Sequence, residues 1–201
     1  STSLYAQYTN ASASVGAGNL LLLSAANSAF SLSTGKQLEV GIKQSAFEGR
    51  LDYTVAAYKI ELDNVLSRDF SNPTLTVNSG KQSARGLELA ATWKATRDLM
   101  LSGNLARVDA RFDQLIEAGN ASRAGNTPPN VPQTVANLWA DYRVPGWPVR
   151  VGAGVNRTGH AFANNANTVR QNGYTTATAY ATWTLSKGDL TFRVRNLPDR
   201  F

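Results

Sequence analysis

Apolar and polar residues alternate one by one along much of the chain. In residues 173–185, GYTTATAYATWTL, alanine, Trp183 and Leu185 fill one set of alternate positions, and threonine and tyrosine fill the other. Because successive side chains of a strand point to opposite faces, this pattern predicts a strand with one apolar and one polar face. The same alternation predicts nine strands in total, near residues 4–9, 37–43, 51–63, 86–93, 99–105, 136–142, 149–156, 173–185 and 190–195. The one candidate helix is short, at residues 112–118, FDQLIEA.

The connections between these strands alternate strictly between short and long. The short ones have the length of hairpin turns and fall near residues 47–49, 95–98, 145–147 and 186–189. The long ones, rich in Gly, Asn, Ser and Pro, fall near residues 15–35, 65–80, 112–132 and 159–172. An up-and-down antiparallel sheet places all short turns at one edge and all long loops at the other. This is the layout of an outer-membrane β-barrel with short periplasmic turns and long extracellular loops.

Aromatic residues cluster near the short turns. They are Trp93, Tyr142, Trp147 and Trp183. A ring with one polar atom is favoured where hydrocarbon meets lipid headgroups, so we predict that these residues form a membrane girdle. The alternative is that they close the end of a soluble barrel.

A barrel in lipid also explains the alanine-rich face, because acyl chains require only an apolar surface. The opposite face would line a wet lumen, and we predict that it carries Gln37, Glu39, Lys43, Glu88, Asn137, Asp141, Arg150, Asn156, Thr178, Arg193 and Arg195. Gly152 and Gly154 are expected to make room on that side. The alternation breaks phase at residues 56–58, where a β-bulge would reverse the register.

Composition and charge exclude several other classes of protein. No run of about 18 apolar residues is present, so no transmembrane helix is predicted. The net charge is +6, but the basic residues are scattered singly, which does not favour nucleic-acid binding. The chain has no cysteine, and residues 1–10 do not resemble a signal peptide.

Enzymatic chemistry is not expected either. His160 is the single histidine and begins a long loop, while Asp109 and Asp113 fit a solvated rim better than acid–base catalysis. The segment GAGVNRTG at residues 152–159 does not match a phosphate-binding loop.

Several segments, in order, resemble one family. They are GKQLEVGIK (35–43), FEGRLDYTVAAYKIELDNVL (47–66), GKQSARGLELAATW (80–93), NTPPNVPQTVANLWADYRV (126–144), GAGVNRTG (152–159), NGYTTATAYATW (172–183) and RVRNLPDRF (193–201). Together they resemble the late barrel strands of TonB-dependent outer-membrane receptors, especially the siderophore branch. The resemblance implies a barrel of about 22 strands around a plug, of which these nine would be about the thirteenth to the twenty-first. Residues 1–201 would then be the C-terminal portion of the barrel, without the plug domain and the last strand.

The resemblance also implies a function and its partners. The whole protein would be an active transporter of the bacterial outer membrane that takes up ferric siderophores. Its partners would be membrane lipid, the rest of its own barrel and plug, and the TonB complex, which acts through an N-terminal region absent here. No resident cofactor or metal is expected, since the ferric siderophore is cargo. The alternatives are a passive porin-type barrel and a soluble β-rich binding protein.

Ligand recognition would fall on the long loops. Ferric siderophores are large, often anionic and often aromatic, so arginine and aromatic residues would suit them. The candidates are Arg68, Phe70, Arg111, Phe112, Arg123, Phe162 and Arg170. For each, the alternative is a solvated loop residue or, for arginine, a contact with lipopolysaccharide.

Overall fold

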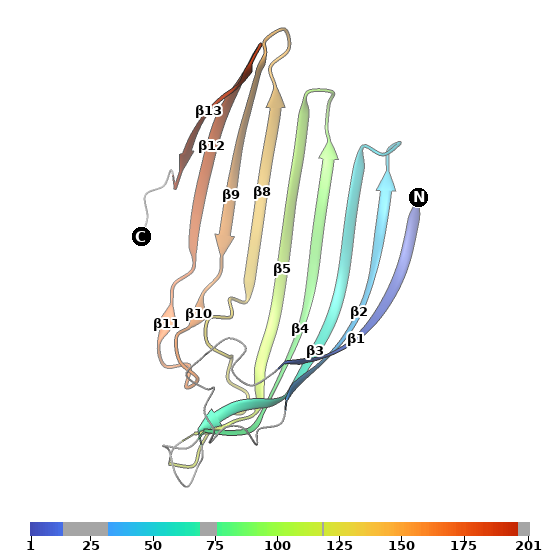
Figure 1. Cartoon of the computed structure of the whole chain (residues 1–201). Helices are drawn as coiled ribbons and strands as arrows, with labels where there is room; N and C mark the ends of the chain where they lie inside the picture. The colour runs from blue at the N-terminus through green and yellow to red at the C-terminus, as the bar shows by residue number, and fades with distance from the viewer. Residues whose placement is uncertain (14–31, 69–75, 118, 197–201) are drawn as a thin grey trace.

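The computed structural model describes residues 1–13, 32–68, 76–117 and 119–196, and this part of the chain is all-β. Nine strands form one antiparallel sheet (Figure 1). In sheet order they are β1 (Thr2–Ala13), β2 (Ser33–Ala46), β3 (Leu51–Arg68), β4 (Thr76–Lys94), β5 (Leu99–Gln114), β8 (Thr134–Arg143), β9 (Val149–Thr158), β12 (Tyr174–Leu185) and β13 (Gly188–Arg195). The nine predicted strands are thus confirmed.

Two very short hairpins complete the described structure. β6 (Ile116–Glu117) pairs with β7 (Ala121–Ser122), and β10 (Ala161–Phe162) pairs with β11 (Arg170–Gln171). The expected helix at residues 112–118 is wrong over its described residues, because residues 112–114 end β5 and residues 116–117 form β6. Backbone pairing across loop 115–133 replaces the helical hydrogen bonds.

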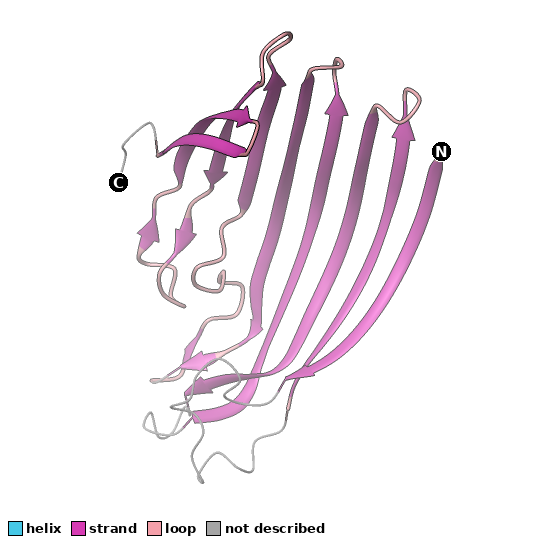
Figure 2. Cartoon of the chain, turned by 45° about the horizontal axis from the view of Figure 1, so that its top comes forward, coloured by secondary structure: helices cyan, strands magenta, loops and turns pink. Residues whose placement is uncertain are grey.

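The sheet is open rather than closed (Figure 2). Each strand pairs with the next one along the sheet, and within the described residues β1 and β13 each have a partner on one side alone. The short turns lie at the top of Figure 1, and the described parts of the longer connections between β5 and β8 and between β9 and β12 lie lower in the view. The short turns and the described long connections therefore lie at opposite edges of the sheet.

The register determines which side chains share a face. One row runs directly across seven strands through Lys43, Thr54, Ala90, Asn104, Asn137, Asn156 and Thr176. The neighbouring row, on the opposite face, runs through Ile42, Val55, Leu89, Leu105 and Ala136. We call the first the polar face and the second the apolar face.

The predicted β-bulge at residues 56–58 is wrong. Pairing between β3 and β4 runs without interruption from Leu51 to Leu62, and the register shifts only between Leu62 and Leu66. Ala57 consequently lies on the apolar face and Tyr58 on the polar face. The change of pattern in the sequence has another cause: the apolar face itself becomes charged from Lys59 onward, toward the loop end of the strand.

Little of the described chain is buried, and many large hydrophobic side chains are exposed. The buried hydrophobic residues are Ala56, Phe112, Leu115 and Ala161, and three of these lie near the loop end of the sheet. Exposed ones on the apolar face include Leu87 and Leu138, each 61% exposed. Among the described residues, no helix is long and apolar enough to cross a membrane.

Candidate functional site: polar face and loop surface

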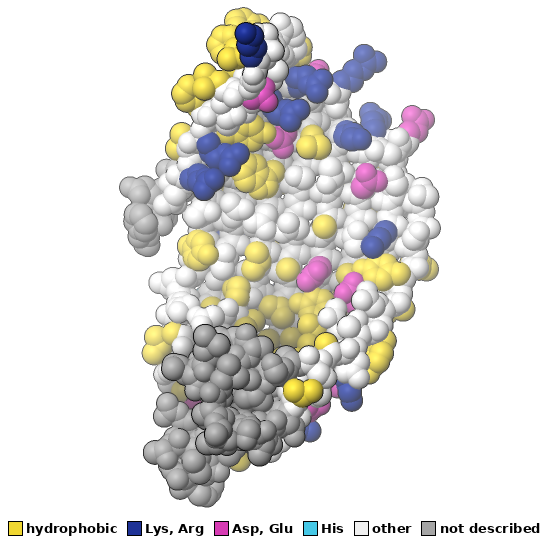
Figure 3. Space-filling view, viewed as in Figure 1, with side chains coloured by type: hydrophobic (Ala, Val, Ile, Leu, Met, Phe, Trp, Pro, Cys, Tyr) yellow, Lys and Arg dark blue, Asp and Glu magenta, His cyan; other side chains and the backbone are white. Residues whose placement is uncertain are grey.

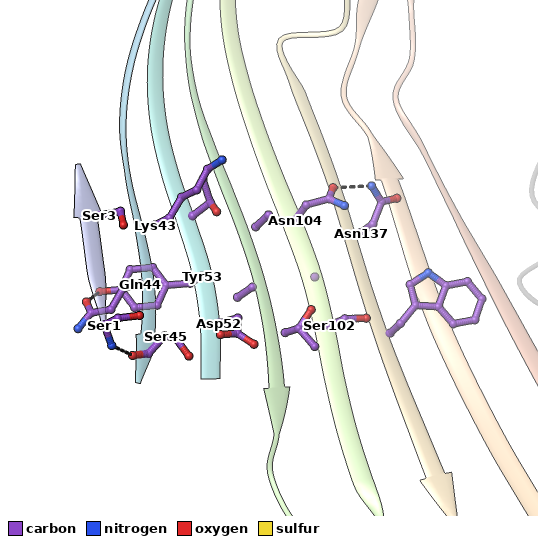
Figure 4. Close-up of a pocket in the computed structure, with 16 residues that line it drawn as sticks. Ser1, Ser3, Lys43, Gln44, Ser45, Asp52, Tyr53, Ser102, Asn104 and Asn137 are labelled. Carbon is purple, nitrogen blue, oxygen red and sulfur yellow. Dashed lines mark hydrogen bonds between the residues drawn. The ribbon is translucent and has the colours of Figure 1, made fainter. Parts of the chain in front are cut away.

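All eleven residues predicted to line a lumen lie on the polar face, as their pairing shows. One cavity on this face has a volume of about 580 Å³ and is lined by Lys43, Asp52, Asn104, Asn137 and their neighbours (Figure 4). Within it Asn137 Nδ2 donates a hydrogen bond to Asn104 Oδ1 at 2.7 Å. The cavity wall combines polar side chains with Ala90 and Trp139 and is built from several adjacent strands.

Aromatic rings on the polar face lie against glycines of the neighbouring strand. Tyr58 is directly opposite Gly86, and a Cβ added to that glycine would lie 2.5 Å from the Cζ atom of the ring. Tyr5 covers Gly41 in the same way, with a corresponding distance of 2.6 Å.

Two further pairs repeat this arrangement toward the other end of the sheet. Tyr180 lies against Gly152, and Trp139 lies against Gly154. The expectation that Gly152 and Gly154 make room on this side agrees with this packing. The aromatic partners were not identified from the sequence, although glycine inside a strand is itself a signal of a close approach.

Two tyrosine hydroxyls on this face, those of Tyr5 and Tyr180, reach carboxylates. Tyr5 donates to Glu39 Oε1 at 2.7 Å, and Gln37 Nε2 donates to Glu39 Oε2 at 3.0 Å. Lys43 Nζ lies 4.9 Å from the centroid of the Tyr5 ring. The glutamate is therefore held by two donors in a fixed position on the wall.

A second such group lies nearer the short turns. Tyr180 donates a hydrogen bond to Asp141, and the guanidinium carbon of Arg193 lies 5.9 Å from the Tyr180 ring centroid. The polar face is thus ordered by side-chain contacts that link β8, β12 and β13.

The four predicted girdle residues are exposed. Trp93, Tyr142 and Trp183 lie on the apolar face, opposite Leu51, Val151 and Leu190 respectively, and are 40–48% exposed. Trp147 lies in the turn between β8 and β9 and is 65% exposed. All four therefore lie near the turn end of the strands, and their contact with lipid stays a prediction.

The loop end of the apolar face differs sharply from its middle. Four ion pairs occur there: Lys59 with Glu61 at 2.6 Å, Arg85 with Asp109 at 2.9 Å, Arg111 with Asp113 at 3.1 Å, and Lys81 with Asp63 at 3.4 Å. These charges mark where the apolar surface of the sheet ends.

The candidate ligand-binding residues do not form one cluster. Arg111 pairs with Asp113 at 3.1 Å, and Arg123 pairs with Glu117 at 2.6 Å. Phe162 is half-buried, with its ring edge-on to His160, and Arg170 is exposed. Phe70 and the side chain of Arg68 lie outside the described residues.

Phe112 departs from the expectation of a surface residue. Its side chain is 3% exposed, because its backbone pairs with the returning loop: Phe112 N donates to Asn126 O, and Gly125 N donates to Phe112 O, both at 2.8 Å. Phe112 therefore packs within the loop structure, and its role in ligand binding stays a prediction.

The two long connections at 115–133 and 159–173 are fastened to each other, which the sequence did not reveal. Thr127 N donates to Asn167 Oδ1 at 2.8 Å, and Asn167 Nδ2 donates to Thr127 O at 2.8 Å. Asn126 Nδ2 donates to Asn165 O at 2.8 Å, and Asn165 Nδ2 donates to Glu117 Oε1 at 2.7 Å. We call these contacts the loop latch. No group of three or more His, Asp or Glu residues able to hold a metal ion occurs in the described parts of the chain.

Comparison with known proteins identifies the family. The model of the family described as TonB dependent receptor-like, beta-barrel matches residues 1–197. The chain is 30% identical over 179 residues to the ferrichrome outer membrane transporter and phage receptor of Escherichia coli K12, covering 85% of this chain and 23% of the relative. It is 32% identical over 174 residues to the ferrioxamine receptor of Yersinia enterocolitica, covering 83% of this chain and 24% of the relative.

A solved structure agrees with this result. The siderophore receptor PiuA of Acinetobacter baumannii superimposes with a TM-score of 0.83 at 26% identity, over 99% of this chain and 30% of that one. This chain thus spans about a quarter of the length of the curated relatives named above. It belongs to the β-barrel family of the TonB-dependent receptors, which are receptors and transporters of the outer membrane and not enzymes.

Proposed function

We propose that this chain is the C-terminal portion of the barrel of an active outer-membrane transporter that takes up ferric siderophores. The observation that carries the proposal is the two-faced open sheet, which matches a siderophore receptor over 99% of its length. The named relatives bind or transport ferrichrome and ferrioxamine. Ferrichrome and ferrioxamine are both chelates of the ferric ion, which favours a chelated ferric ion as the cargo of this receptor.

The remainder of the same polypeptide would complete the barrel. Within the described residues, the edges at β1 and β13 present unpaired backbone groups, which a hydrocarbon environment does not tolerate. Further strands would pair with both edges, and a plug would fill the space in front of the polar face. The apolar face would contact acyl chains, with Trp93, Tyr142, Trp147 and Trp183 at the periplasmic headgroups.

Energy would come from the TonB complex acting on the plug, so no resident cofactor is proposed. Among the candidate ligand residues, Arg170 is exposed and forms no ion pair within the described residues, while Arg111 and Arg123 already pair with carboxylates. We place cargo recognition on the loop end of the polar face, beside the loop latch.

Uptake measurements test this function. The full-length receptor would be expressed in cells that lack their own ferrichrome and ferrioxamine receptors, and uptake of both complexes labelled with radioactive iron would be followed. We expect saturable uptake that disappears when TonB is deleted. Uptake that persists without TonB would instead indicate a passive porin-type barrel, and no uptake of any ferric siderophore tested would reject the proposal.

A further inference from the structure

Basic side chains gather at the turn end of the polar face (Figure 3). Two adjoining cavities, of about 510 and 490 Å³, share Arg143 and Arg150 in their linings. Together they contain six basic residues, Arg50, Lys94, Arg97, Arg143, Arg150 and Arg193, against the three acidic residues Asp98, Asp141 and Asp189. We call the six basic residues the basic rim.

None of these basic groups is neutralised by an ion pair within the described residues. The five ion pairs found there lie elsewhere: four at the loop end of the apolar face and one, between Arg123 and Glu117, in loop 115–133. Of the three nearby carboxylates, Asp141 already accepts the hydroxyl of Tyr180. The basic rim thus retains a positive charge directed at whatever occupies the space in front of it.

The charge on the polar face also changes sign along the strands. A cavity of about 530 Å³ in the middle of the sheet is lined by Glu39 and Glu88 against Lys43 alone. Any occupant that matches this wall has the reverse order of charge, acidic near the short turns and not acidic in the middle. A small free anion would match the rim alone, whereas a polypeptide can match both.

We propose that the basic rim is a docking site for an acidic segment of the polypeptide that fills the lumen of the complete receptor. The inference rests on the proposed function, since it requires a plug. This chain spans about a quarter of the length of its relatives, so most of the proposed receptor would lie outside residues 1–201 and could supply such a segment. The planar guanidinium groups of Arg143, Arg150 and Arg193 suit carboxylates, which they bind through paired N–H donors. The lipid headgroups are a poorer match, because the rim lies on the face opposite the apolar surface.

Cross-linking in the full-length receptor tests the contact directly. Arg193→Lys places a primary amine in the rim, and a water-soluble carbodiimide then joins it to a carboxylate in direct contact, with loss of water to the reagent. We expect mass spectrometry to identify an amide between Lys at this position and an Asp or Glu outside residues 1–201. Cross-links confined to Asp141 and Asp189, or none, would overturn the proposal. Arg107→Lys on the apolar face, opposite Leu87 and Thr134, is the matched control and should give no link to that segment.

Charge reversal tests the consequence for closure of the lumen. In cells, the double variant Arg150→Glu with Arg193→Glu should increase sensitivity to a large hydrophilic antibiotic by roughly tenfold, as expected when an attraction becomes a repulsion of similar size. Arg107→Glu should leave the antibiotic sensitivity unchanged. The double variant Arg150→Lys with Arg193→Lys keeps both positive charges and should show the same sensitivity as the wild type. Equal sensitivity of the reversed variant and the control, with both barrels folded as judged by heat-modifiable mobility, would overturn the inference. Uptake by the wild-type receptor with and without TonB decides the proposed function independently of these results.

Discussion

The close packing of Tyr58 on Gly86 makes a strong prediction about stability. In Gly86→Ala the new Cβ would lie 2.5 Å from both Cζ and the hydroxyl oxygen of Tyr58, and 2.8 Å from Cε1. Ordinary contacts between such atoms are about 3.5–4.0 Å, so the ring must move away from β4 by about 1 Å or more. Overpacking of this kind typically costs about 1–3 kcal/mol. We therefore expect Gly86→Ala to lower the free energy of unfolding by about that amount.

The sign of the effect should reverse when the ring is removed. In a Tyr58→Ala background the added methyl group meets no aromatic ring, and alanine restricts the unfolded backbone more than glycine does. Gly86→Ala should then be stabilising by about 0.5–1 kcal/mol. The two substitutions would thus be strongly coupled, as residues in direct contact usually are.

Urea unfolding of the purified full-length receptor, followed by tryptophan fluorescence, measures this coupling across the four variants of the cycle. The slope of the free energy of unfolding against urea concentration should be the same in all four variants, so that a shift of the unfolding midpoint reports a change in stability. If Gly86→Ala destabilises equally with and without Tyr58, the ring is not the cause and the packing argument is wrong. Gly41→Ala with Tyr5→Ala provides an independent repeat in β1 and β2, where the corresponding distance is 2.6 Å.

Three further outcomes follow from the two faces and the loop latch. Bromine-labelled lipids in reconstituted vesicles should quench the fluorescence of Trp183 on the apolar face but not that of Trp139 on the polar face, and equal quenching would contradict the assignment of faces. Leu138→Arg should cost about 2–4 kcal/mol in a refolding titration, because it places a charge in the lipid-facing belt, whereas Asn104→Arg on the polar face should cost less than about 1 kcal/mol. Asn167→Ala removes hydrogen bonds of the loop latch and should raise hydrogen exchange at Thr127 by roughly fivefold or more without moving the global unfolding midpoint; unchanged exchange would show that the latch does not hold the loops.

The sequence predicted the strands well because alternation is a local property. Alternation with a period of two can be recognised without knowing which strands pair with each other. The lengths of the connections between predicted strands can likewise be read directly from the sequence. The same reasoning failed at residues 56–58. There the break in hydrophobic pattern reflected a change in the surroundings of the strand, from a belt of apolar side chains to charges such as Lys59, and not a change in the backbone.

The contacts within and between the loops could not be predicted from local sequence patterns. Phe112 looks like an exposed aromatic residue at a strand end, yet pairing with residues 125–126 buries it. The loop latch joins Thr127 to Asn167, forty residues apart, through asparagine side chains that have no distinctive sequence pattern. Such contacts depend on where the two loops leave the sheet.

What the sequence by itself determined is the two-faced character of each strand, the order of turns and loops, and the resemblance to an outer-membrane receptor. Each depends on residues that are close together in the chain. What only the tertiary structure decided is which residues meet across strands: the rings that cover Gly86 and Gly152, the carboxylates that the tyrosines hold, and the convergence of Arg143, Arg150 and Arg193. These depend on register, and register is the joint result of every turn and every neighbouring strand in the sheet.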